Sequence, residues 1–104
     1  MPTFETGTPL RASIDLAATG TIVAAVAAKK IVVLNYLLVA DTAVAVNWES
    51  NTTDISGVML LGVGIPVAAT DNEFGLLETA AGEKLDLTLG AAVQVSGHIT
   101  YVLV

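Results

Sequence analysis

The stretch GEKLDLTLGAAVQVSGHITYVLV, residues 82–104, decides the fold class of this chain. From Leu85 onward the odd positions are apolar or small, and the even positions up to Thr100 are mostly polar or small. A period of two is typical of a strand with one buried face, because successive side chains point to opposite faces of a sheet. The stretch therefore predicts two strands whose odd residues form part of a core.

Shorter stretches of the same kind precede this one. LRASIDL (Leu10–Leu16) alternates strictly, and AVAVNWES (residues 43–50) places Val44, Val46 and Trp48 on one inward face. KIVVLNYLLVA (residues 30–40) is apolar on both faces, which predicts a strand covered from both sides. Two further strands are expected, the first in TIVAAVAA and the second, broken by glycines, in VMLLGVGI. These two stretches are residues 21–28 and 58–65.

Gly, Asp and Asn separate these segments at regular spacing, and almost nothing in the chain has a helical period. The longest irregular stretch is PVAATDNEFG, residues 66–75. About eight short strands in this arrangement predict an all-β fold, an antiparallel β-sandwich of the jelly-roll type. We expect a single domain over residues 9–104, preceded by a flexible arm over residues 1–8.

Composition excludes several classes of function. The formal charge is −6, and Lys29 and Lys30 form the only basic pair, so direct nucleic-acid binding is not expected. Asn35 and Asp41 interrupt the longest apolar stretch, which argues against a membrane span, and no secretory signal is found at the start. Only 13% of residues are charged and 54% are hydrophobic, a surface balance that favours self-association.

Catalytic and metal-binding groups are sparse. By parity, Ser96, His98 and Asp86 are predicted to lie on the same outward face of the final strands. Neither an oxyanion hole nor a nucleophile elbow accompanies them, so we expect no enzyme. Asp71, Glu73 and Glu78 cluster in sequence without the spacing of a calcium loop, which favours a solvated acidic surface. No cofactor and no metal are predicted.

Five apolar or aromatic side chains are candidates for contacts with a partner. Trp48, beside a polar loop, and Phe74, in the longest loop, fit equally well as covers of the core or as interface anchors. Phe4 is the one aromatic in the arm, so we expect the arm to dock on a partner through it. Val102 and Val104 interrupt the polar face of the last strand, which predicts that this end lies against a neighbouring subunit.

The order of segments resembles a group of small virion proteins of tailed bacteriophages. The segments are KKIVVLNYLLVA, VNWESNTTDISG, LLGVGIPV and ETAAGEKLDLTLGAAVQVSGHITYVLV, and together they cover about residues 30–104. The acidic loop ATDNEFG departs from the Gly- and Pro-rich, aromatic loop that is more usual in that group.

The resemblance implies a jelly-roll decoration (cement) protein. Such a protein would form a homotrimer on the outer surface of the capsid and clamp neighbouring major capsid subunits after synthesis in the host cytoplasm. The alternative is a carbohydrate- or receptor-binding jelly roll of a phage fibre or tail. For that alternative, Trp48 with Glu49 and Asn51 would supply an aromatic platform beside polar groups.

Overall fold

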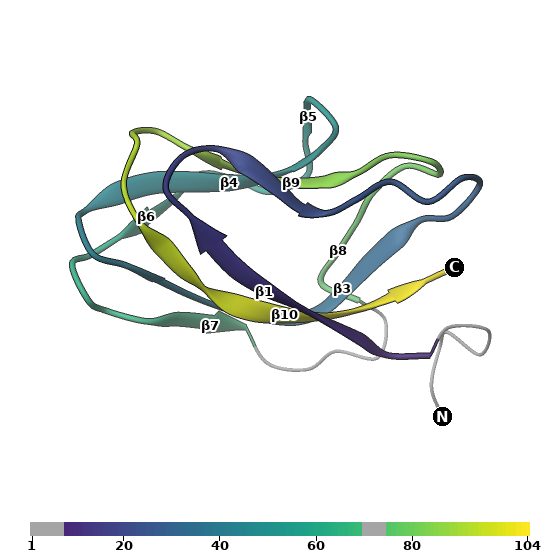
Figure 1. Cartoon of the computed structure of the whole chain (residues 1–104), viewed down its shortest axis with the longest axis horizontal. Coiled ribbons are helices and arrows are strands. Elements are labelled where there is room, and N and C mark those ends of the chain that lie inside the picture. Colours follow the sequence, from purple (N-terminus) through teal and green to yellow (C-terminus); the bar gives the residue numbers. More distant parts are fainter. Residues whose placement is uncertain (1–7, 70–74) are drawn as a thin grey trace.

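The computed structural model describes residues 8–69 and 75–104, and there it forms two antiparallel sheets packed face to face (Figure 1). The first sheet contains β1 (Leu10–Leu16), β10 (Val95–Leu103), β3 (Ile31–Ala40) and, both on the far side of β3, β7 (Val67–Ala69) and β8 (Leu77–Glu78). The second contains β2 (Gly20–Val23), β9 (Leu85–Leu89), β4 (Val44–Ser50) and, both on the far side of β4, β5 (Thr53–Asp54) and β6 (Met59–Leu61). The described residues include no helix of the length and apolarity that a membrane span requires.

The order of strands is that of a jelly roll. β5 and β6 pair with successive parts of β4, and β7 and β8 pair with successive parts of β3, so each pair is one strand with an interruption. With each pair counted once, the order is 1-8-3-6 in one sheet and 2-7-4-5 in the other. The chain thus passes repeatedly from one sheet to the other, as two Greek keys do. The predicted all-β, jelly-roll sandwich is confirmed.

The core lies between the sheets and follows the predicted parity. Val44, Val46 and Trp48 of β4 are buried, while Ala45 and Asn47 between them are half-buried. The same alternation brings odd residues of β9 and β10 inward, and residues of β1 and β3 complete the core from the first sheet. The buried core members from these four strands are Leu85, Leu87, Leu89, Val95, Ile99, Ile14, Ile31, Val33, Leu38 and Ala40.

Three expectations about strand limits need correction. The strand expected over residues 21–28 ends at Val23, and residues 24–28 are exposed, because a run with four alanines offers little apolar area to bury. The stretch 66–75 is not wholly irregular, since β7 lies within it and pairs with β3. Two-sided burial in β3 is complete only over residues 31–33, and residues 34–37 are half-buried.

The register of the final strands is testable by a pair of neighbouring substitutions. Leu87 is fully buried, so Leu87→Ala should lower the free energy of unfolding by about 2–5 kcal/mol. Thr88 points the other way and donates one hydrogen bond to Glu49 Oε1 (2.7 Å), so Thr88→Ala should cost about 1 kcal/mol or less. Urea unfolding of both variants measures the difference. Equal losses would contradict the register of β9.

Candidate functional site

Ser96, His98 and Asp86 do not form a catalytic group. Ser96 and His98 lie on β10 in the first sheet, whereas Asp86 lies on β9 in the second. Equal parity places all three on outward faces, but the outward faces of two packed sheets look in opposite directions. His98 is exposed between Ser13 of β1 and Leu37 of β3. The prediction that the three lie on the same outward face is wrong.

Asp86 instead ties β2 to β9. It is 8% exposed, accepts a 2.7 Å hydrogen bond from Thr21 Oγ1 and forms a 3.3 Å ion pair with Lys84. Its partner strand β2 is short and irregular in register, so this side-chain pair reinforces a weak ladder. The carboxylate is therefore occupied by structural contacts.

Ser50 has a comparable role at the end of β4. Its hydroxyl donates to Glu83 Oε1 (2.6 Å) and accepts a hydrogen bond from the backbone N–H of Ala80 (3.0 Å). These bonds fasten the approach to β9 onto β4. Like Asp86, Ser50 is buried, and its polar atoms are used within the fold.

The acidic cluster is only partly described. Asp71 and Glu73 lie outside the described residues. Glu78 is exposed on β8 and pairs with Lys30, with 3.4 Å between Nζ and Oε2. Among residues 8–69 and 75–104, no three His, Asp or Glu side chains come together in a way that could hold a metal ion.

Trp48 belongs to the core and not to the surface. Its side chain is 0% exposed, and its ring lies 5.3 Å from that of Tyr36 between ring centroids, tilted by 56°. Its backbone N–H donates to Ser56 Oγ (2.8 Å), and its carbonyl accepts from the N–H of Ile55 (3.0 Å). Of the two interpretations of this ring, the structure supports the core. The structure therefore contradicts both the expected role of Trp48 as an interface anchor and its expected role as an exposed platform for a sugar.

The C-terminal valines are held within the chain. Val102 is 2% exposed, and it pairs in register with Val32 of β3. Val104 is half-buried, and both its N–H and its carbonyl bond to Lys30, at 3.0 and 2.8 Å. Val102 is therefore not exposed to solvent in a single chain, and the reason for expecting a neighbouring subunit at this residue is wrong. The other two candidates, Phe4 and Phe74, lie outside the described residues.

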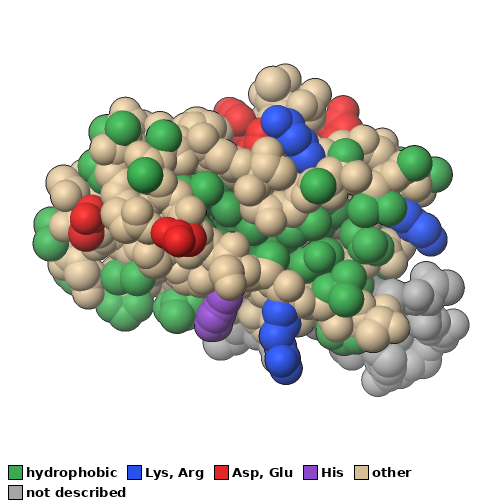
Figure 2. All heavy atoms as spheres, viewed as in Figure 1, with side chains coloured by type: hydrophobic (Ala, Val, Ile, Leu, Met, Phe, Trp, Pro, Cys, Tyr) green, Lys and Arg blue, Asp and Glu red, His purple; other side chains and the backbone are tan. Residues whose placement is uncertain are grey.

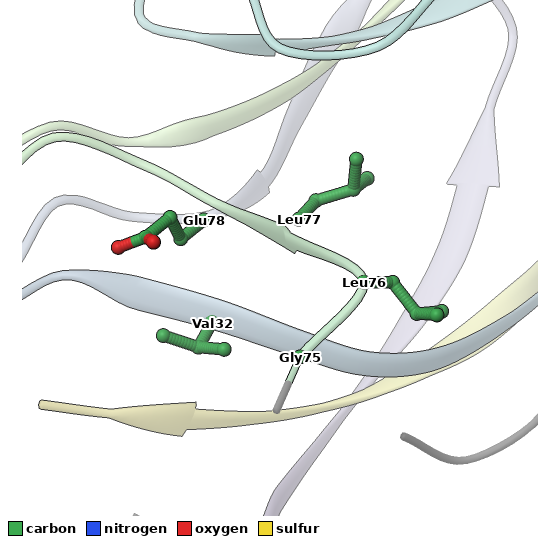
Figure 3. Close-up of a pocket in the computed structure, with 5 residues that line it drawn as sticks. All are labelled: Val32, Gly75, Leu76, Leu77 and Glu78. Atoms are coloured by element: carbon green, nitrogen blue, oxygen red, sulfur yellow. The ribbon is translucent and has the colours of Figure 1, made fainter. Parts of the chain in front are cut away.

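A shallow depression lies beside β8, lined by Val32 and residues 75–78 (Figure 3). In Figure 3, the side chains of Leu76 and Leu77 point in different directions, and Glu78 and Val32 extend from neighbouring strands. Most of these side chains are aliphatic, and the one carboxylate is paired with Lys30. Its one polar side chain is this paired carboxylate, so no set of polar side chains converges there to orient a small ligand.

The most unusual surface feature is a set of exposed aliphatic side chains on β6 and directly before and after it. We call Val58, Leu60, Val63 and Ile65 the apolar edge. Their side chains are 67%, 83%, 64% and 62% exposed, respectively. Figure 2 shows hydrophobic side chains at the surface at this end of the sandwich, on the left, where β6 leads into β7.

Sequence reasoning missed the apolar edge. It treated residues 58–65 as a strand interrupted by glycines and did not separate its inward from its outward side chains. One signal was present: from Gly57 to Ala69 the chain has no charged side chain and no hydroxyl or amide side chain. A strand buried on both faces and an unprotected surface strand share that composition, so only the structure separates them.

Comparisons with protein-family models, with curated proteins and with solved structures found no match to this chain.

Proposed function

We propose that this chain is a structural protein of a tailed-phage virion, a capsid-decoration protein that associates with itself and clamps neighbouring major capsid subunits on the outer surface. The observation that carries the proposal is the ordered resemblance over residues 30–104. Its segments overlap β3, β4–β5, β6–β7 and β8–β10, which include the central strands of both sheets. The fold that the resemblance implies is the one this chain adopts.

The chemistry of the described residues is consistent with a scaffold. The buried polar side chains Ser50, Thr79 and Asp86 all make hydrogen bonds or ion pairs within the fold. Fold alone does not determine function, so this consistency supports the proposal only together with the resemblance. A decoration protein requires a rigid body and adhesive surfaces, and the apolar edge is a surface of that kind.

The alternative, a carbohydrate- or receptor-binding module, has lost its main support. Sugar-binding sites commonly use an exposed aromatic ring as a stacking platform, and Trp48 is fully buried. The two tyrosines are half-buried and pack against the core. Within the described part of the chain, no exposed Phe, Tyr or Trp ring takes the place of Trp48.

The number of copies per virion tests the proposal. Quantitative mass spectrometry of purified virions should find this protein at a copy number comparable to that of the major capsid subunit. The purified protein should also bind capsids that lack it, with saturation at a fixed ratio to the capsid subunit. A few copies per particle, or binding confined to tails, would support the fibre or tail alternative instead.

A further inference from the structure

The apolar edge is centred on Leu60 of β6, a strand at the margin of its sheet, with Val58 before the strand and Val63 and Ile65 after it. β6 pairs with residues 44–46 of β4, and among the described residues no strand pairs with its other side. Leu61 points into the core at 2% exposure, while Leu60 beside it is 83% exposed. β6 therefore presents both unpaired backbone groups and a large outward aliphatic side chain, the combination that favours pairing with another chain.

β6 lacks the charged side chains that protect the margin of the first sheet at β1. Proteins usually guard edge strands with charged side chains, and β1, at the margin of the first sheet, carries exposed Arg11 and Asp15. The segment from Gly57 to Ala69 has no charged residue. On the same margin β5 carries exposed Asp54, and Asp41 lies beside the β6–β7 loop because the N–H of Gly64 donates to the carbonyl of Ala40 (2.8 Å).

We propose that the apolar edge is the surface through which two copies of this chain associate, with β6 of one copy antiparallel to β6 of the other. The charge distribution favours a second copy as the partner. Each chain carries −6, so two copies repel over most of their surfaces and approach most easily where charge is absent. A basic partner would find no carboxylate in this segment to pair with.

Antiparallel pairing of two identical edges has two-fold symmetry, because the same residues face each other from both sides. The species expected is therefore a dimer, which differs from the trimer that the resemblance implies. The inference deepens the proposed function by naming the surface of self-association, and it rests on the self-association part of that proposal. Whether the dimer then binds a capsid is a separate question.

The size of the apolar edge sets the strength of the contact. Burying one aliphatic side chain of this kind removes roughly 60–120 Å² of apolar surface, so the four residues of two copies supply about 500–1,000 Å². Stable interfaces bury about 1,200 Å² or more, and β6 is only three residues long, so backbone pairing adds few hydrogen bonds. We expect a weak dimer that forms with increasing protein concentration.

Sedimentation velocity of the full chain at rising concentration tests the inference. Leu60→Lys places a charge on the edge, as natural edge strands do, and should raise the dissociation constant of the dimer roughly tenfold or more. The matched control is Val26→Lys. Val26 is 37% exposed in the connection between β2 and β3, at the opposite end of the sandwich from the β6–β7 turn (Figure 1), and this variant should dimerise as the wild type does.

Salt separates an apolar contact between like-charged copies from an ionic one. Raising the salt concentration should strengthen the dimer, because it screens the repulsion between acidic copies and leaves apolar contacts in place. Thermal melting followed by circular dichroism checks that Leu60→Lys is folded, and Val58→Lys serves if it is not.

A wild type that stays monomeric to millimolar concentration, a trimer as the first assembled species, a dimer that salt dissolves, or unchanged association of the folded lysine variants would each overturn the inference. None of these measurements uses capsids. Failure of self-association is therefore distinguishable from failure of the proposed function, which the virion copy number and capsid binding test.

Discussion

Replacing Gly97 by alanine should prevent the chain from folding stably. Gly97 lies in β10, the strand between β1 and β3, and pairs with Ile14 on one side and Leu38 on the other. Its φ angle is +151°, a conformation that residues with a side chain rarely adopt. A Cβ atom built there would overlap the carbonyl oxygen of Leu37, which is backbone of the neighbouring strand and has no alternative rotamer.

Two costs therefore combine in Gly97→Ala. The first is an unfavourable backbone conformation, and the second is an overlap that only a shift of β3 against β10 can relieve. Together they should lower the free energy of unfolding by about 4 kcal/mol or more, a large part of the 5–15 kcal/mol that stabilises a typical domain. Urea unfolding should show a much lower midpoint, or loss of the cooperative transition.

Gly57→Ala is the matched control. No atom lies within 4 Å of a Cβ built at Gly57, and its φ angle is not positive, so the same substitution should change the midpoint little. A Gly97→Ala variant as stable as the control would show that β10 and β3 are not packed as closely as the structure has them.

The special position of Gly97 was not predictable from the alternating pattern. The sequence places Gly97 among the small residues at odd positions of the last strand, and parity is a property of one strand alone. The need for glycine arises from the close approach of Leu37, sixty residues earlier in the chain. The inward direction of Trp48, in contrast, follows from β4 itself, and parity predicted it correctly.

Parity also explains the error over Ser96, His98 and Asp86. Within a strand, alternation separates the core face from the outer face, but it does not assign the strand to a sheet. β9 and β10 are consecutive in the chain, yet the jelly-roll connection places them in opposite sheets. Outward residues of two such strands are separated by the whole thickness of the sandwich, whereas inward residues of the same two strands meet in the core. Pairing between strands, which depends on distant segments, decides which outward residues meet.

Removing Val102 to Val104 should destabilise the chain itself and not only its assemblies. Val102 and Leu103 pair with Val32 and Ile31, and Val104 makes two backbone hydrogen bonds to Lys30. Loss of the buried Val102 side chain, of these backbone bonds and of the cover they give to β3 should together cost about 4 kcal/mol or more.

Removal of Val104 alone is the graded control. It deletes the two hydrogen bonds to Lys30 but leaves Val102 in place, so the loss should be about 1–2 kcal/mol. Unfolding should be measured for both truncations over a wide range of protein concentration. Stability that comes from contacts within one chain does not depend on concentration, whereas stability that comes from association between copies does.

The concentration dependence decides what the C-terminal end does. Because Val102 is 2% exposed in a single chain, the truncation should lower the unfolding midpoint by the same amount at every concentration. A loss of stability that appears only at high protein concentration would instead support the contact with a neighbouring subunit that the sequence predicted for this end. In that case this end would be an interface alongside the apolar edge. The two surfaces would then be separable, because Leu60→Lys should weaken the dimer without changing the midpoint of the dilute monomer.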